Sequence, residues 1–334
     1  MKQLSLLAIL VLMGFFACQQ QPAPADAADT AGIALFTQVK PELSYKNLRL
    51  YPITADAGFI KGNERAAQYI SLSEAIKNSR FRITEHKPYG RFEDAAAVNT
   101  LTVQNKSTDT VFLMAGDIVQ GGNQDRVIAQ DMVFPPRTIT DIPVFCVEPG
   151  RWAPNHQEDG DGNLPEKNKR IYAFTGYYNV AASGIRQTVK HSKDQQEVWD
   201  KVGQVTSAHH AQAATGAYAA LEQSDSFTAS RDAYLRFFED KFADAENVVG
   251  VVAVSGHDVI GADIFAHPGL FKKLYPSLLH SYITDAITYG APVEVTDNRM
   301  EHYAAELLKD FMEPSPQPES KYVYRGMMVH FTSF

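Results

Sequence analysis

The sequence predicts an α+β fold, with a largely antiparallel β N-terminal half and mixed helices and strands in the C-terminal half. From Gly32 to about Glu148, short apolar and β-branched stretches are separated by turn-forming residues, which is typical of strands. Helical periodicity begins after Trp199. Strands first and mixed elements later favour an α+β architecture. The 334-residue chain is long enough for one large or two modest domains, and we expect a single domain over residues 32–334.

The N-terminal half contains six predicted strands and one short helix. Ser71 opens the helix, and Glu74 three residues later completes a capping box, in which each side chain binds the other residue's backbone amide. The polar segment from Arg151 to about Arg170 is expected to form a long loop, and long loops within domains often carry function. The strands are expected over residues 33–39, 48–53, 81–85, 101–105, 111–115 and 142–148, and the helix over 72–78.

The C-terminal half mixes helices with a hairpin and a final strand. A helix over 230–242 places Tyr234, Phe237, Phe238 and Phe242 on one stripe, so we expect it to pack on a sheet. The remaining elements are a hairpin of strands 248–254 and 259–265, helices over 270–289 and 297–312, and a last strand over 322–331.

Residues 1–17 have the features of a signal peptide. Lys2 precedes an apolar run over 4–17, which is shorter than the about 20 residues that a membrane-spanning helix needs. The run ends directly before Cys18. This end resembles the lipobox of bacterial lipoproteins, in which the cysteine is lipidated and becomes the new N-terminus, although Phe15 stands where Leu is usual. We expect cleavage before Cys18; the alternative is an ordinary secreted protein cut near the Ala-rich stretch that follows.

Residues 18–31 are expected to be the lipidated cysteine and a flexible tether, because 19–31 contain no large apolar side chain that folding would bury. Acyl chains on Cys18 would attach the domain to a membrane, since each buried methylene contributes about 0.8 kcal/mol. Because Gln19 is not Asp, resemblance to Gram-negative sorting habits implies the outer membrane of the cell envelope. Whether the domain faces the periplasm or the outside stays open.

Composition bounds the remaining possibilities. Hydrophobic residues make up 45% of the chain, and the formal net charge is −8 without a basic tract. A basic patch is the electrostatic footprint of nucleic-acid binding, so we expect no nucleic-acid partner. If Cys18 carries lipid, Cys146 is the only other cysteine, and an intramolecular disulfide is impossible. Cys146 alternates with Val144 and Ile142, which predicts a buried structural thiol.

Two stretches in the middle of the chain contain more polar residues than strand packing requires. They are residues 116–126 (GDIVQGGNQDR) and 147–152 (VEPGRW). They resemble the signature of a family named for its genomic association with ADP-ribosylglycohydrolase and rhodanese-phosphatase proteins, and residues 72–85 and 249–286 are similar to other parts of that family. The resemblance covers about residues 40–290. It implies no established reaction, and the family's genomic company suggests a nucleotide- or ADP-ribose-type ligand.

The same residues predict a binding site from their chemistry. Arg126 and Arg151 offer forked donors suited to phosphate or carboxylate, and Trp152 offers an aromatic face for a base or sugar. Asp117 and Glu148 can hold hydroxyls or act as general acid and base. Two glutamines can read polar edges of a ligand. The predicted site, for an anionic and ring-containing small molecule, comprises Asp117, Gln120, Gln124, Arg126, Glu148, Arg151 and Trp152.

Three functions stay open at this point. The first is a lipid-anchored protein that binds such an anion, and the second is a hydrolase that uses Asp117 or Glu148 as general acid or base. The third is a structural or interaction lipoprotein without a small-molecule site, in which Arg126–Glu148 and Arg151–Asp117 are structural ion pairs. The sequence specifies no cofactor. Asp263, in the family-like GADIF stretch, either binds a ligand or caps a hairpin.

No metal site is predicted. Residues 159–163 (DGDGN) begin like a calcium loop, but Leu164 stands where that loop needs glycine and Arg170 where it needs a bidentate carboxylate. A solvated polar loop explains them. The adjacent His209 and His210 would diverge by about 100° on a helix, which does not favour a shared metal ion.

Overall fold

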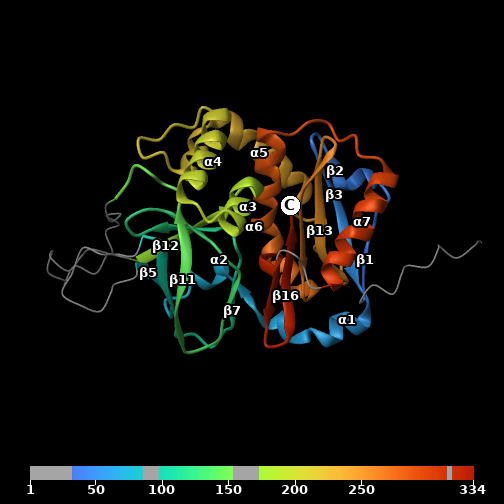
Figure 1. The fold of residues 1–334 in the computed structure, drawn as a ribbon, viewed down its shortest axis with the longest axis horizontal. Helices are drawn as coiled ribbons and strands as arrows, with labels where there is room; N and C mark the ends of the chain where they lie inside the picture. The colour runs from blue at the N-terminus through green and yellow to red at the C-terminus, as the bar shows by residue number, and fades with distance from the viewer. Residues whose placement is uncertain (1–31, 86–97, 153–172, 314–317) are drawn as a thin grey trace, which may run out of the picture.

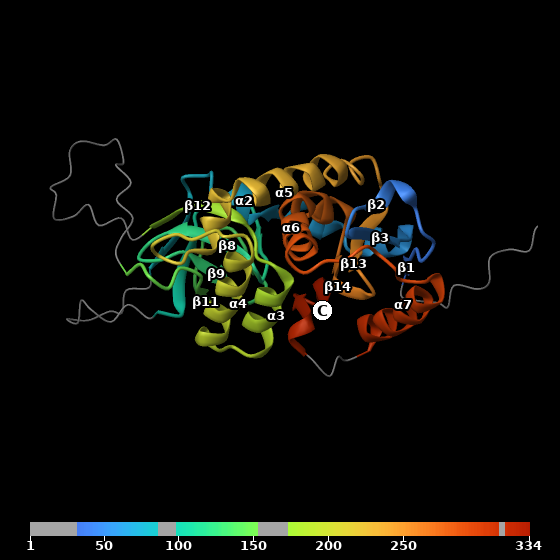
Figure 2. The same cartoon turned by 90° about the horizontal axis from the view of Figure 1, so that it is seen from above.

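Two β-structures lie side by side in the computed structural model, which describes residues 32–85, 98–152, 173–313 and 318–334 (Figures 1 and 2). One is a closed six-stranded barrel and the other a seven-stranded sheet. We call the barrel with helices α3 and α4 the barrel half, and the sheet with α5, α6 and α7 the sheet half. The predicted α+β class is confirmed, including the antiparallel strands of the N-terminal half.

The barrel is antiparallel throughout, with the strand order β11-β6-β5-β12-β8-β9. Alternation along each strand directs apolar side chains such as Ile83, Val103, Val119 and Val144 into one buried cluster. A three-stranded sheet of order β10-β7-β4 lies beside it, and its β4–β7 pair is parallel. The strands are β4 (Ile70–Ser71), β5 (Phe81–Glu85), β6 (Thr100–Asn105), β7 (Val111–Leu113), β8 (Asp117–Gly121), β9 (Arg126–Ile128), β10 (Met132–Phe134), β11 (Thr138–Cys146) and β12 (Ala173–Val180).

The seven-stranded sheet has the order β1-β3-β13-β14-β16-β15, with β2 paired to β3. Its central strand β13 is buried along its whole length. Val251 belongs to the core under α5 and α6, whereas Val252 and Val254 belong to the core under α7. Helices therefore cover both faces of this sheet. The strands are β1 (Ile33–Leu35), β2 (Ser44–Tyr45), β3 (Leu48–Ala55), β13 (Val248–Ser255), β14 (Asp258–Phe265), β15 (Lys321–Tyr324) and β16 (Met327–Ser333).

The helices bury apolar faces against these sheets. Tyr234 and Phe238 of α5 join the core of the sheet half, as the predicted aromatic stripe requires. Ile185 and Val189 of α3 pack with Val202 of α4 on the outer surface of the barrel. Burial of each such large apolar side chain contributes about 1.5–3 kcal/mol. The helices are α1 (Ala57–Gly62), α2 (Leu72–Ala75), α3 (Ser183–His191), α4 (Gln195–Ala208), α5 (Asp225–Phe238), α6 (Pro268–Thr288) and α7 (Asp297–Met312).

Local signals in the sequence account for several element boundaries. The predicted capping box is present: the Glu74 amide donates to Ser71 Oγ at 3.3 Å, and the Ser71 amide donates to Glu74 Oε2 at 2.9 Å. The helix that it opens is shorter than predicted and ends at Ala75. Helix α7 spans the predicted residues, and the predicted hairpin is formed by β13 and β14.

The predicted last strand over 322–331 is wrong, because the chain folds there into the hairpin β15–β16. Arg325 and Gly326 both have positive φ, 51° and 78°, as a two-residue hairpin turn of the type I′ class requires. Strand β11 also differs from the predicted 142–148, since it starts at Thr138 and ends at Cys146. Helix α4 begins before Trp199. Strands β8, β9, β10 and β12 and helix α3 are not among the predicted elements.

The predicted signal peptide (1–17), the tether (18–31) and the calcium-like segment (159–163) lie outside the described residues. Within the described ranges, no helix combines the length and the apolar character needed to cross a bilayer.

Candidate functional site

One end of the barrel interior is polar, and we call it the barrel mouth (Glu85, Gln124, Arg126 and Cys146). Glu85 ends β5, and Arg126 faces Cys146 across the β9–β11 pair. All four residues are buried. The Cys146 thiol donates to Gln124 Oε1 at 2.9 Å, and burial raises its pKa to about 11. Cys146 is thus a buried thiol, as predicted, and its unreactive protonated form helps to fix Gln124.

Arg126 is fully buried at the mouth. Its Nη1 donates to the Gln124 carbonyl oxygen at 3.0 Å and to Gln124 Oε1 at 3.1 Å. Glu85 Oε1 lies 3.9 Å from Nη2, and the guanidinium carbon lies 5.9 Å from the ring centroid of Trp152. The Nε and Nη2 atoms have no hydrogen-bond partner. The predicted closeness of Arg126, Gln124 and Trp152 is therefore present, although Trp152 itself is 54% exposed.

Arg151 is held by carboxylates of the chain itself. Its Nη2 lies 2.6 Å from Glu148 Oε2 and 3.0 Å from Asp125 Oδ1, and its Nη1 donates to the Gly122 carbonyl at 2.9 Å. Glu148 Oε2 also accepts the Asp125 amide at 3.1 Å. Arg151 therefore ties the residues after β11 to the turn between β8 and β9.

A cavity of about 290 Å³ opens beside Arg151, lined also by Gln120, Asp125, Glu148 and Thr175. Burial and then the nearby Glu148 carboxylate raise the pKa of Asp125. The two carboxylates outnumber the one guanidinium and already bind it. The electrostatics of this cavity consequently do not favour an anion.

Asp117 stands apart from the other six predicted residues. Its carboxylate accepts the Met114 amide and the Tyr177 hydroxyl, both at 2.8 Å, and burial raises its pKa to about 7. The two structural ion pairs considered from the sequence are replaced by others: Arg151 pairs with Glu148 and Asp125, and Arg126 lies 3.9 Å from Glu85. Ligand binding or acid–base catalysis at these residues stays a prediction.

A second polar cluster, the buried charge network, joins the two halves of the molecule. Its members come from the β9–β10 connection, α3, β14, α6 and β16, and all are buried. His330 is central: its Nδ1 lies 2.8 Å from Asp131 Oδ2, and its Nε2 lies 2.9 Å from Asp263 Oδ1. The network comprises Asp131, Arg186, Lys190, Asp263, Tyr282 and His330.

Each carboxylate of the network is ionised by its neighbours. Burial alone would raise the pKa of Asp263, but Arg186, at 3.1 and 2.5 Å, and His330 hold it well below its usual value. Burial would also raise the pKa of Asp131, but the nearby Lys190 and His330 lower it by more. Burial would lower the pKa of His330, but the two carboxylates raise it. Each ring nitrogen of His330 faces a carboxylate oxygen, and because an ionised carboxylate can only accept, this geometry favours an imidazole that donates from both nitrogens.

A cavity of about 440 Å³, the lysine cavity, borders this network. Lys190, Lys193 and Lys321 line it, together with the carboxylates of Asp131 and Glu319. Its walls include apolar and aromatic side chains, namely Met132, Pro143, Phe145, Val189 and Tyr322. A ligand-sized space with apolar walls and a few convergent charges is typical of small-molecule sites.

The comparison with protein families assigns the chain. The family model of the ARG and Rhodanese-Phosphatase-superfamily-associated protein domain, ARPP-1, matches residues 37–331. The chain belongs to this family. The ARPP-1 match extends beyond the 40–290 stretch in which the resemblance was seen, and it includes every residue of the buried charge network. No curated protein and no solved structure matches the chain.

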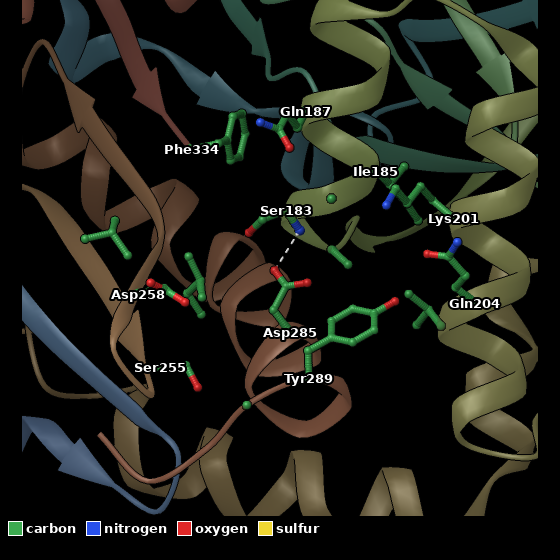
Figure 3. Close-up of a pocket in the computed structure, with 16 residues that line it drawn as sticks. Ser183, Ile185, Gln187, Lys201, Gln204, Ser255, Asp258, Asp285, Tyr289 and Phe334 are labelled. Carbon is green, nitrogen blue, oxygen red and sulfur yellow. Dashed lines mark hydrogen bonds between the residues drawn. The ribbon is translucent and has the colours of Figure 1, made fainter. Parts of the chain in front are cut away.

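The ARPP-1 domain has a further cleft, of about 460 Å³, between α3 and α4 on one side and the β13–β14 hairpin and the end of α6 on the other (Figure 3). Asp285 projects into it beside Tyr289, and its Oδ2 accepts the Ser183 amide at 2.8 Å. Burial raises the pKa of Asp285 to about 6. Asp258 and Lys201 also line the cleft, so its charges suit a neutral or cationic molecule better than an anion.

Of the network residues, the sequence singled out Asp263, as a ligand-binding or hairpin-capping residue; the other five and the lysine cavity were not predicted. The available signal was the spacing of Arg186 and Lys190, which lie four residues apart and so share one face of α3. The approach of Asp131 and His330, 199 residues apart, left no comparable sign. Across the described ranges, no group of three His, Cys, Asp or Glu side chains is arranged to hold a metal ion.

Proposed function

We propose that the chain binds an anionic, ring-containing small molecule, of the nucleotide or sugar-phosphate kind, in the lysine cavity. The observation that carries this proposal is Lys190. Its side chain is buried, and its Nζ has no hydrogen-bond partner in the structure. A buried amine without a hydrogen bond is costly whether or not it carries a proton, so it marks a position where a ligand acceptor would be favourable.

The carboxylates near Lys190 are already bound by other groups. Asp131 lies 3.6 Å from Lys190 Nζ, but it accepts the Ala115 amide at 2.7 Å and pairs with His330. Glu319 lies 2.8 Å from His191 Nδ1. The cavity thus offers lysine donors that its own acids do not fully use, whereas Arg151 is bound by Glu148 and Asp125.

Thermal unfolding of the purified mature chain tests the proposal, with AMP, ribose 5-phosphate and inorganic phosphate as probes. A probe at 100 times its dissociation constant adds about 2.7 kcal/mol to the stability of the folded state. Lys190→Gln removes this amine donor, so we expect about tenfold weaker binding. Lys309→Gln, on the exposed side of α7, is the matched control and should leave binding unchanged.

The location can be refuted with one further variant. If Arg151→Gln abolishes the shift and Lys190→Gln does not, the anion binds in the cavity beside Arg151 and not in the lysine cavity. If none of the probes stabilises the wild type at millimolar concentration, the proposal of an anionic small molecule fails.

We also propose that Cys18 carries the lipid that anchors this domain to the outer membrane. Metabolic labelling with a palmitate analogue should mark the wild type and not Cys18→Ala, and fractionation should place the labelled form in the outer membrane. Equal labelling of both forms, or an unlabelled wild type, would contradict the anchor.

A further inference from the structure

We infer that Lys190 is a nucleophilic amine, and that the ligands of the lysine cavity include anionic aldehydes and ketones, which Lys190 captures as imines. This inference rests on the proposed function, because the cavity must first admit the anion. It adds a chemical role for Lys190 and a carbonyl group to the ligand.

Lys190 and Arg186 lie on the same face of α3, but only Arg186 is paired with Asp263. Arg186, one turn earlier, is bound through both terminal nitrogens by Asp263. Lys190 has no such bond, and the nearest carboxylate oxygen, Asp131 Oδ2, lies 3.6 Å from its Nζ. A protonated lysine has three N–H donors that need acceptors, whereas a neutral amine has two and carries no charge. Leaving the neutral amine without hydrogen bonds at this buried position therefore costs less free energy.

The charge balance of the network also favours the neutral amine. Asp263 already binds Arg186 and His330 Nε2, and Asp131 already binds His330 Nδ1, so these two carboxylates are largely occupied before Lys190 is considered. Burial lowers the pKa of Lys190; the attraction of Asp131 opposes this effect, and the repulsion of Arg186 adds to it. Desolvation and a neighbouring cation are the two means by which proteins activate lysine nucleophiles.

Asp117 is a further carboxyl close enough to interact with Arg186 and Asp131. Its pKa of about 7 leaves it partly protonated at neutral pH, so it compensates the network only in part.

The reaction needs no oxidant or reductant. The lone pair of Lys190 Nζ attacks the carbonyl carbon, and the carbonyl oxygen takes up a proton as its π electrons move to it. The nitrogen of this adduct loses a proton, for which the Asp131 carboxylate is the nearest base. The proton taken up by Asp131 is returned to the hydroxyl group of the adduct, which leaves as water while the nitrogen lone pair forms the carbon–nitrogen double bond of a protonated imine. Lys193 and Lys321, which line the same cavity, would hold the anionic group of the ligand.

Reductive trapping tests this role directly. Pyridoxal 5′-phosphate, which combines an aldehyde, a ring and a phosphate, is mixed below one equivalent with the purified mature chain. The imine is reduced with sodium borohydride, and peptide mass spectrometry locates the modified lysine. We expect Lys190 to be modified before the exposed lysines, and excess inorganic phosphate to slow the reaction.

Two comparisons sharpen the result. Pyridoxal, which lacks the phosphate, should modify Lys190 at least about tenfold more slowly, the equivalent of one 1.4 kcal/mol anion contact. Lys309→Gln should react at Lys190 like the wild type, whereas Lys190→Met should lose the fast-reacting site while keeping the wild-type circular dichroism spectrum.

Modification spread over exposed lysines, with Lys190 unmodified, overturns the inference. If phosphate and AMP still stabilise the wild type in that case, the proposed function stands and only the carbonyl chemistry fails. Equal modification of Lys190 by pyridoxal and its phosphate overturns the anionic ligand class. The absence of any stabilisation by anions refutes the proposed function separately.

Discussion

Replacing Asp263 by Asn tests whether the buried charge network holds the barrel half to the sheet half. The Asp263 carboxylate binds Arg186 Nη1 and Nη2 at 3.1 and 2.5 Å, His330 Nε2 at 2.9 Å, and the Tyr282 hydroxyl. All of these groups are buried. Asn keeps one oxygen, but it replaces the other with an amide group that faces the donors of Arg186 and His330. Both residues therefore lose their negatively charged partner at once.

The expected loss is large for a change of one atom. Removing one partner of a buried ion pair costs about 3–5 kcal/mol, because it leaves an uncompensated buried charge. Since Asp263 serves both Arg186 and His330, we expect a value at the upper end of that range. Equilibrium urea unfolding at pH 7, followed by circular dichroism, measures it as a lower midpoint with an unchanged slope.

Asp258→Asn is the matched control, because it makes the same chemical change in an exposed pair. Asp258 Oδ1 lies 3.3 Å from Arg299 Nη2, and the two side chains are 80% and 58% exposed. Exposed pairs contribute about 0–1 kcal/mol, so little change is expected. If Asp263→Asn costs no more than Asp258→Asn, the network does not stabilise the junction, and the reasoning from burial is wrong.

Three further predictions concern single positions. Gly116 has a φ of 102°, and an added Cβ would lie 2.6 Å from Arg186 Cγ. Gly116→Ala should therefore lower the free energy of unfolding by about 1–3 kcal/mol in the same urea assay, and an unchanged midpoint would contradict this expectation. The Cys146 thiol, with its pKa raised to about 11 by burial, should resist maleimide at pH 8 until urea unfolds the chain, and rapid labelling of the folded protein would disprove its burial. Burial raises the pKa of Asp285 from 3.8 to about 6, so the folded state binds the Asp285 proton more tightly than the unfolded state does. The stability that this proton contributes is therefore lost as pH rises from about 4 to above 6. The Asp285→Asn variant keeps an acceptor for the Ser183 amide but cannot ionise, so the variant should gain stability relative to the wild type as pH rises from about 4 to above 6. If the stabilities of variant and wild type change in parallel with pH, the raised pKa of Asp285 is wrong.

The central motif shows where reasoning from sequence succeeded and where it stopped. It correctly brought Gln124, Arg126 and Trp152 together, because residues in neighbouring strands and turns are close whatever the rest of the fold does. It predicted arginines available to an anion. In the folded chain Arg151 is bound by Glu148 and by Asp125, which lies 26 residues away, and no local pattern encodes that pairing.

Several features were determined by the sequence itself. The α+β class and the capping box at Ser71 follow from periodicity and from contacts over three or four residues, which the chain makes wherever it is placed. The β13–β14 hairpin has the same kind of origin. The proposed anchor at Cys18 also rests on sequence alone, because a short apolar run before a cysteine needs no fold to be recognised.

Tertiary structure alone decided the closure of the barrel, the hairpin that replaced the last predicted strand, and the buried charge network. Asp131, Arg186 and His330 resemble ordinary surface residues in the sequence, since nothing in a residue's type records whether water will reach it. Their pairing depends on α3, β14 and β16 meeting beside the barrel. Burial in that junction fixes which charges are compensated, and it leaves the amine of Lys190 without a hydrogen bond, 3.6 Å from the nearest carboxylate oxygen.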